Sequence, residues 1–246
     1  MKEKSLVFGL HAVQAILTTQ PKRIERLIIL KERHDQKIQN LLDLAKQNHI
    51  KIELVPRHEL DRIADQENHQ GVIAFCQRAK NLSESDLETL LDAIKGPVLL
   101  LILDGIQDPH NLGACLRSAD AAGVHAVIAP RDKSVGLTPT VSKVASGAAE
   151  SVPFIQVTNL ARTLRMLQDR NIWIYGAAGE ADKTLYQSDL KGSIAVVLGA
   201  EGAGLRRLTR DHCDQLLKIP MHGSVSSLNV SVATGIFLFE AVRQRQ

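Results

Sequence analysis

Residues 98–117 read VLLLILDGIQDPHNLGACLR, an apolar run of six residues followed by a polar loop and a helical pattern. A run that is apolar at every position is expected for a strand covered on both faces, as in the centre of a parallel sheet. The loop and helix after it complete the strand–loop–helix unit of an α/β fold. We therefore expect a buried strand at 98–103 and a helix near 112–122.

Similar units flank this segment and form two blocks. In the first block we expect helices at 9–18 and 35–47 and strands at 26–30, 51–55 and 71–75. In the second we expect strands at 126–129, 152–157, 172–175, 194–198 and 215–219 and helices at 160–168 and 228–243. A polar segment that becomes a short amphipathic helix and ends at Gly96-Pro97 separates the blocks. The pattern predicts an α/β protein with domains at 1–77 and 97–246 and a linker at 78–96.

The composition is that of a globular chain, with 44% hydrophobic and 23% charged residues among 246. The net charge of +3 does not by itself indicate a nucleic-acid partner. A membrane span needs about 20 consecutive apolar residues, whereas the apolar run at 98–103 has six. The N-terminus also has no apolar segment of the length that a signal peptide needs. We therefore expect a cytoplasmic chain with no membrane partner. Cys76, Cys115 and Cys213 are widely spaced, which disfavours both a disulfide framework and a bound metal.

Three loops that follow predicted strands are rich in Gly, Asn and Ser, and ligands of open α/β sheets bind at the carboxyl ends of strands. They are 104–117, with the pattern Asn111-x-Gly113-x-x-x-Arg117, then VLGAEGAGL at 197–205, then IPMHGSVSSLNVSVATG at 219–235. Each has a simpler interpretation: Asn111, Ser227 or Asn229 can cap a helix. Glu201 can be a loop carboxylate in water.

Several enzyme classes are disfavoured by the same loops. The glycines at 199, 202 and 204 have the reverse of the G-x-G-x-x-G spacing, so a nicotinamide-dependent oxidoreductase remains only a weak alternative. No G-x-x-x-x-G-K-[ST] motif is present, which argues against nucleotide hydrolysis. The serines of the third loop are not in a G-x-S-x-G turn, which argues against a serine hydrolase.

Taken together and in this order, the three motifs resemble the signature motifs of the SpoU (TrmH-type) RNA ribose methyltransferases over residues 98–246. The segments FGLHAV at 8–13 and HQGV at 69–72 resemble the small RNA-binding domain that precedes the catalytic domain in one branch of that family. The resemblance implies a small N-terminal α/β RNA-binding domain and a C-terminal α/β domain with a mainly parallel sheet and a trefoil knot. It also implies a homodimer formed through the C-terminal domain.

The activity implied by the resemblance is transfer of a methyl group from S-adenosylmethionine to a ribose 2′-hydroxyl. The resemblance points to a guanosine in the peptidyl-transferase loop of 23S rRNA as the target. The front domain favours large-subunit rRNA, either naked or in an assembling large subunit. Two alternatives remain: another rRNA or tRNA nucleotide, or a non-catalytic RNA-binding assembly factor. The implied catalytic residues are Arg117, Asn111, Glu201, Ser227 and Asn229. The implied cofactor contacts are Leu198, Gly199, Gly204, Ile219, Met221, Ser227 and Leu228.

The chemistry of the arginine limits what Arg117 can do. A guanidinium keeps its proton at neutral pH, so Arg117 is better suited to clamp a phosphate or orient the hydroxyl than to act as a resting base. Other basic side chains are candidates for RNA contact, namely Arg206, Arg207 and Arg210 after the glycine loop and His11 in the front domain. His69 either faces RNA or has a structural role.

Overall fold

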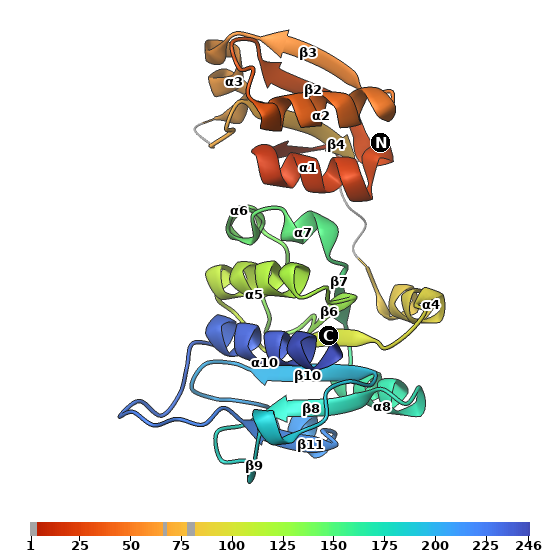
Figure 1. Ribbon diagram of the computed structural model, residues 1–246, viewed down its shortest axis with the longest axis vertical. Coiled ribbons are helices and arrows are strands. Elements are labelled where there is room, and N and C mark those ends of the chain that lie inside the picture. The colour runs from red at the N-terminus through yellow and green to blue at the C-terminus, as the bar shows by residue number, and fades with distance from the viewer. Residues whose placement is uncertain (1–3, 66–67, 78–81) are drawn as a thin grey trace. The chain divides into compact units, whose positions relative to one another are not determined.

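The computed structural model describes residues 4–65, 68–77 and 82–246, which form two compact units (Figure 1). The first unit contains the chain up to Lys80 together with Ser146–Ser151, and the second contains Asn81–Ala145 and Val152–Gln246. Residues 78–81 of the predicted linker 78–96 lie outside the described residues. The rest of that segment includes helix α4 (Glu84–Ala93), which begins with a capping box between Ser83 and Asp86 and belongs to the second unit.

The first unit is a four-stranded sheet with helices on both faces. Its elements are β1 (Lys4–Phe8), α1 (Leu10–Thr19), η1 (Pro21–Arg23), β2 (Ile24–Leu30), α2 (Gln36–Gln47), β3 (Lys51–Val55), α3 (Arg57–Ala64), β4 (Val72–Gln77) and, from later in the chain, α7 (Ala148–Ser151). The strand order is β1-β4-β2-β3, in which only β2 and β3 are parallel. The sheet is therefore mixed. The apolar pattern of the sequence does not predict this, because strand direction depends on how the loops turn.

Hydrophobic spacing explains which face each helix covers. Alternate residues of β2 point to opposite faces, so Leu27 and Ile29 meet α1 and α2 while Ile28 meets Leu60 of α3. Asp35 caps α2 by accepting hydrogen bonds from the backbone N–H groups of Lys37 and Ile38. The predicted helices and strands of this block are all present, and β1 and α3 are additions.

The second unit contains a seven-stranded sheet in which every pair is parallel. In addition to α4, its elements are β5 (Leu99–Asp104), α5 (Pro109–Ala121), β6 (Ala126–Pro130), α6 (Pro139–Ala145), β7 (Phe154–Val157), α8 (Leu160–Asp169), β8 (Trp173–Ala177), β9 (Lys183–Thr184), η2 (Leu185–Gln187), β10 (Ile194–Gly199), α9 (Arg207–Asp211), β11 (Gln215–Lys218) and α10 (Val230–Arg245). The strand order is β7-β6-β5-β10-β8-β11-β9. The predicted α/β fold with a mainly parallel sheet is confirmed.

Strand β5 is the buried centre that its sequence predicts, with all six residues inaccessible to solvent or nearly so. Leu100 and Ile102 face a core that also holds Leu87 of α4 and Leu164 of α8. Helices α5 and α10 pack against each other, and α10 contacts β10. From β5 the chain proceeds outward through β6 and β7, then crosses to β8, so the order reverses between β5 and β10. Ligands bind at such a reversal in open parallel sheets. The trefoil knot stays a prediction.

Two features are absent from the described residues. None of the helices resolved there has the length and apolar character that a membrane crossing requires. Within the same part of the chain, no group of three or more His, Cys, Asp or Glu side chains is arranged to hold a metal ion.

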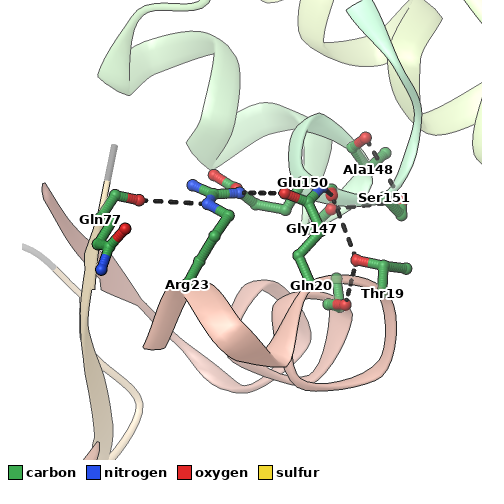
Figure 2. A network of polar contacts seen from close by, with 9 residues as sticks. Thr19, Gln20, Arg23, Gln77, Gly147, Ala148, Glu150 and Ser151 are labelled. Carbon is green, nitrogen blue, oxygen red and sulfur yellow. Dashed lines mark hydrogen bonds and ion pairs between the residues drawn. The ribbon is translucent and has the colours of Figure 1, made fainter. Parts of the chain in front are cut away.

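Residues 146–151 join the first unit through polar contacts with α1 and η1 (Figure 2). Arg23 Nη1 lies 2.9 Å from Glu150 Oε2, and Gln20 Nε2 donates to the Glu150 carbonyl oxygen at 3.1 Å. The Arg23 and Glu150 side chains are only 16% and 15% exposed, so water screens this ion pair less than it screens a surface pair. Gly147 has φ +100°, and a Cβ there would lie 2.8 Å from the His11 carbonyl oxygen.

We predict that Gly147→Ala lowers the free energy of unfolding of the first unit by about 1–3 kcal/mol, because alanine is strained at this φ and crowds the start of α1. Urea denaturation measures the change. Gly179→Ala is the matched control, since its Cβ would meet no atom within 4 Å. Equal free energies of unfolding of the two variants would contradict the prediction, because a Cβ at residue 147 would then not crowd the start of α1.

Candidate functional site

The predicted loops meet at the carboxyl edge of the parallel sheet. Gly199, the last residue of β10, is paired in register with Asp104, the last residue of β5. The loops after β5 and β10 therefore start side by side. The third loop follows β11, and its end is bonded to the other two through Asn229.

The glycine loop after β10 is a tight turn that leaves no room for a side chain at Gly199. A Cβ on Gly199 would lie 2.0 Å from the Gly204 carbonyl carbon, so only glycine fits. Ala200 and Gly204 form an isolated bridge, with Gly204 N–H donating to the Ala200 carbonyl oxygen at 2.8 Å. Gly202 and Gly204 have φ of +75° and +65°. This explains the glycine spacing without a dinucleotide site, because the glycines close the loop on itself.

A buried ion pair ties this loop to β5. The Asp104 side chain is 0% exposed and forms a salt bridge with Arg206. Asp104 Oδ2 accepts from the Arg206 backbone N–H at 3.0 Å, and Oδ1 accepts from Nε at 2.5 Å. Since a buried carboxylate needs a cation and hydrogen-bond donors, Arg206 holds the end of the glycine loop against the central strand.

Asn111, Glu201 and Asn229 form a cluster, one residue from each loop. Asn229 Nδ2 donates to Asn111 Oδ1 at 2.9 Å and to Glu201 Oε1 at 2.5 Å. Asn229 Oδ1 accepts from the Ser231 backbone N–H at 2.9 Å. Because one amide donates to two acceptors and accepts in return, its orientation is fixed. The structure thus brings together three of the five predicted catalytic residues.

The capping alternatives have different outcomes. Asn229 caps α10, which confirms one of them. Asn111 is not a cap: α5 begins at Pro109 with Asp108 as its N-cap, and the helix prediction that began at 112 was late by three residues. The reason is that Asp followed by Pro at the first helical position is itself a strong start signal.

Arg117 lies on α5, exposed, and makes no hydrogen bond or ion pair with any described residue. In particular, neither Asn111 nor Glu201 forms a hydrogen bond or ion pair with it. The glycine of the same motif has a packing role, since a Cβ on Gly113 would lie 2.6 Å from the Val144 Cβ of α6. Gly113 therefore allows α5 and α6 to approach closely.

The other candidate residues lie in several environments. Leu198 is buried in β10. Ser227 and Met221 are exposed and Ile219 and Leu228 are half-buried, all four in the third loop. Arg207 is exposed, whereas Arg210 pairs with Glu180 and holds the pKa of that carboxyl below its usual range. His11 is exposed on α1, in the first unit.

The cysteines offer no nucleophile at neutral pH. Burial raises the pKa of Cys115 to about 11 and the pKa values of Cys76 and Cys213 to about 12. All three thiols therefore stay protonated at neutral pH, and covalent cysteine chemistry is disfavoured.

The sequence reasoning missed Asp104 and Ser231 as parts of the site. A charged residue directly after a strand that is apolar at every position was the available signal for Asp104. Ser231, the second residue of α10, donates from Oγ to Asn229 Oδ1 at 2.5 Å, and the sequence had no signal that singled it out among the serines.

We predict that Arg206→Ala lowers the free energy of unfolding of the second unit by about 2 kcal/mol, because it leaves the Asp104 carboxylate buried without its cation. This is less than the roughly 3–5 kcal/mol typical of a fully buried pair, since the Arg206 side chain is 45% exposed. Chemical denaturation compares it with Arg207→Ala, which removes an exposed neighbouring arginine. A loss no larger in Arg206→Ala than in Arg207→Ala would contradict the role of the ion pair.

Comparison with known proteins identifies the family. Residues 98–239 match the model of the SpoU rRNA Methylase family, and residues 6–82 match the model described as RNA 2'-O ribose methyltransferase substrate binding. The 23S rRNA (guanosine-2'-O-)-methyltransferase RlmB of Escherichia coli K12 is 59% identical over 240 residues, 98% of each chain. The RlmB of Shewanella oneidensis is 58% identical over 246 residues, 100% of each chain. The SpoU methyltransferase AviRb of Streptomyces viridochromogenes, solved with AdoMet, is similar with a TM-score of 0.76 and 25% identity, over 98% of this chain and 90% of that one. The chain belongs to the SpoU rRNA methylase family.

Proposed function

We propose that this protein transfers a methyl group from S-adenosylmethionine to the ribose 2′-hydroxyl of a guanosine in the peptidyl-transferase loop of 23S rRNA. Two relatives that match nearly the whole chain at 58% and 59% identity carry the name of that activity. The observation that supports it most directly is the Asn111–Asn229–Glu201 cluster, which joins all three motif loops at one edge of the sheet. A non-catalytic assembly factor would need no such arrangement.

The glycine loop and the third loop have the features that a nucleoside cofactor needs. A Cβ on Gly202 or Gly204 would meet no atom within 4 Å, so backbone groups are open to a ligand there. Met221 and Val225 are 37% and 60% exposed, which leaves apolar surface for an adenine ring. S-adenosylmethionine supplies a methyl group activated by its sulfonium charge. Residues that would hold it are Leu198, Gly199, Gly204, Ile219, Met221, Ser227 and Leu228.

The polar residues then have distinct tasks. A ribose hydroxyl is a poor nucleophile, so precise orientation supplies part of the roughly 7–11 kcal/mol that ideal alignment offers. Arg117, charged and without a protein partner among the described residues, holds an RNA phosphate near the target ribose. Asn229 uses both of its N–H groups and both lone pairs of Oδ1 within the protein, so it acts by orienting Glu201. Glu201 then accepts a hydrogen bond from a ribose hydroxyl group, and Ser227 adds a donor from the third loop.

The substrate and the assembly follow from the same proposal. The target is 23S rRNA, as free RNA or in an assembling large subunit in the cytoplasm. The protein acts as a homodimer formed through the second unit. Val232 and Phe239 are 50% and 48% exposed and lie seven residues apart on α10, so they share one helix face that an identical subunit can cover.

The proposal is tested with labelled S-adenosylmethionine and an unmodified 23S rRNA transcript, followed by mapping of the label. Label on the ribose of one guanosine is expected. Label confined to tRNA or to another rRNA nucleotide would establish the catalytic alternative, and failure to bind S-adenosylmethionine would establish the non-catalytic one.

We predict that Arg117→Ala and Arg117→Lys both lower kcat, by about 100-fold or more for alanine, because lysine retains the charge but not the planar fork. Single-turnover kinetics measures this, with Arg165→Ala as the control for loss of an exposed arginine. Full activity of Arg117→Lys would exclude a specific role of the guanidinium.

We predict that Val232→Glu combined with Phe239→Lys converts the homodimer to monomers, since it places charges in an apolar contact. Sedimentation velocity measures the mass. Tyr186→Lys, which changes a residue that is 56% exposed elsewhere in the unit, should leave the dimer intact. A wild-type protein that is monomeric would refute the proposed assembly.

A further inference from the structure

A cavity of about 280 Å³ lies in the first unit. It is lined by Leu30 and Arg33 around the end of β2, by Arg57 after β3 and by residues 68–71 before β4. Because β2 and β3 are parallel, their carboxyl ends lie at the same edge, where ligands bind in α/β sheets. Two arginines thus line one cavity, Arg33 from the loop after β2 and Arg57 from the start of α3.

Arg33 is held in place but not saturated. Its Nε donates to Asp35 and its Nη1 to the Gln70 carbonyl oxygen. A guanidinium has five N–H groups, so three are left without a partner among the described residues. Gly71, with φ +78°, makes room for this side chain, since a Cβ there would lie 3.1 Å from Arg33 Cδ.

Arg57 lines the same cavity and forms one long ion pair, with Asp61. Its side chain is 78% exposed, and its Nε lies 3.9 Å from Asp61 Oδ2, beyond hydrogen-bond distance. The first turn of α3, which Arg57 begins, has Pro56 at its N-cap and no side-chain cap, so its N–H groups add partial positive charge.

His69 fixes the wall of the cavity. Its side chain is 10% exposed, and its Nδ1 accepts from the Gly71 backbone N–H at 3.0 Å. The proton of the neutral ring then lies on Nε2, which donates to Asp61 Oδ1 at 2.9 Å. With both nitrogens engaged, His69 is a structural residue that shapes the loop at Gln70, where φ is +47°.

We propose that the cavity between Arg33 and Arg57 binds a phosphodiester group of the substrate RNA. This inference rests on the proposed function and names a contact for it in the front domain. Guanidinium groups pair with phosphate oxygens in two-pronged geometry. The lining residues include no Phe, Tyr or Trp, and the ring of His69 is only 10% exposed, so the cavity offers little surface on which a base could stack. Phosphate contacts set position and not sequence, so the site orients the RNA.

The test compares Arg57→Gln with Arg62→Gln in the full-length protein. Arg62 is an exposed arginine of the same helix that does not line the cavity, so the two variants lose the same charge. Binding to an unmodified 23S rRNA transcript is measured over a series of salt concentrations. Arg57→Gln should weaken RNA binding by about 3–10-fold and lower the salt slope by about 1, with the affinity for S-adenosylmethionine unchanged. Arg62→Gln should match the wild type.

Two outcomes would overturn the proposal: unchanged RNA affinity in Arg57→Gln, or equal weakening of RNA binding in both variants. Unchanged RNA affinity together with loss of inorganic phosphate binding in Arg57→Gln would indicate a site for a free anion instead. Since Arg57 is exposed, a folding defect is not expected, and a thermal melt checks it. Failure of the proposed function would differ from all of these, because the wild type itself would then transfer no methyl group to RNA.

Discussion

A carboxylate with no access to water stands at the end of the central strand, and the site depends on how it is neutralised. Asp104 lies where β5 ends, beside the last residue of β10. Arg206 binds its carboxylate in two ways: the backbone N–H donates a hydrogen bond, and the guanidinium forms an ion pair. The pairing holds the end of the glycine loop against β5, the neighbour of the strand β10 from which the loop departs. The turn between Gly199 and Gly204 is therefore closed in two ways. The two glycines pack directly against each other, and the ion pair holds Arg206, which follows the turn, against Asp104.

The carboxyl edge of the sheet combines this ion pair with exposed polar groups. Asn229 joins the other two loops through one amide group and starts α10, so the position of that helix and the geometry of the cluster depend on the same side chain. Arg117, on an exposed surface of α5, has no partner within the part of the chain that the structure describes. The proposed phosphate-binding role fits this arrangement, because a side chain that meets a large polyanion must be available before the substrate arrives.

The sequence predicted most of the architecture because its strongest signals are local. The uniform apolarity of 98–103 indicates a strand buried on both faces, and β5 is one. Local signals do not show strand direction, so the mixed sheet of the first unit was not foreseen. Nor do they show that residues 146–151 pack with α1, because that contact joins segments more than 120 residues apart. The three motif loops were recognised as a set, but the bond from Asn229 to Asn111 and the burial of Asp104 require the folded chain.

We propose that the loops after β10 and β11 form one cofactor site at the carboxyl edge of the sheet, beside the loop after β5. Amide hydrogen exchange of the full-length protein, with and without S-adenosylmethionine, tests this directly. We expect slower exchange on cofactor binding in residues 199–206 and 219–231. Protection located instead at the opposite edge, around residues 186–191, or no protection in the glycine loop, would contradict it.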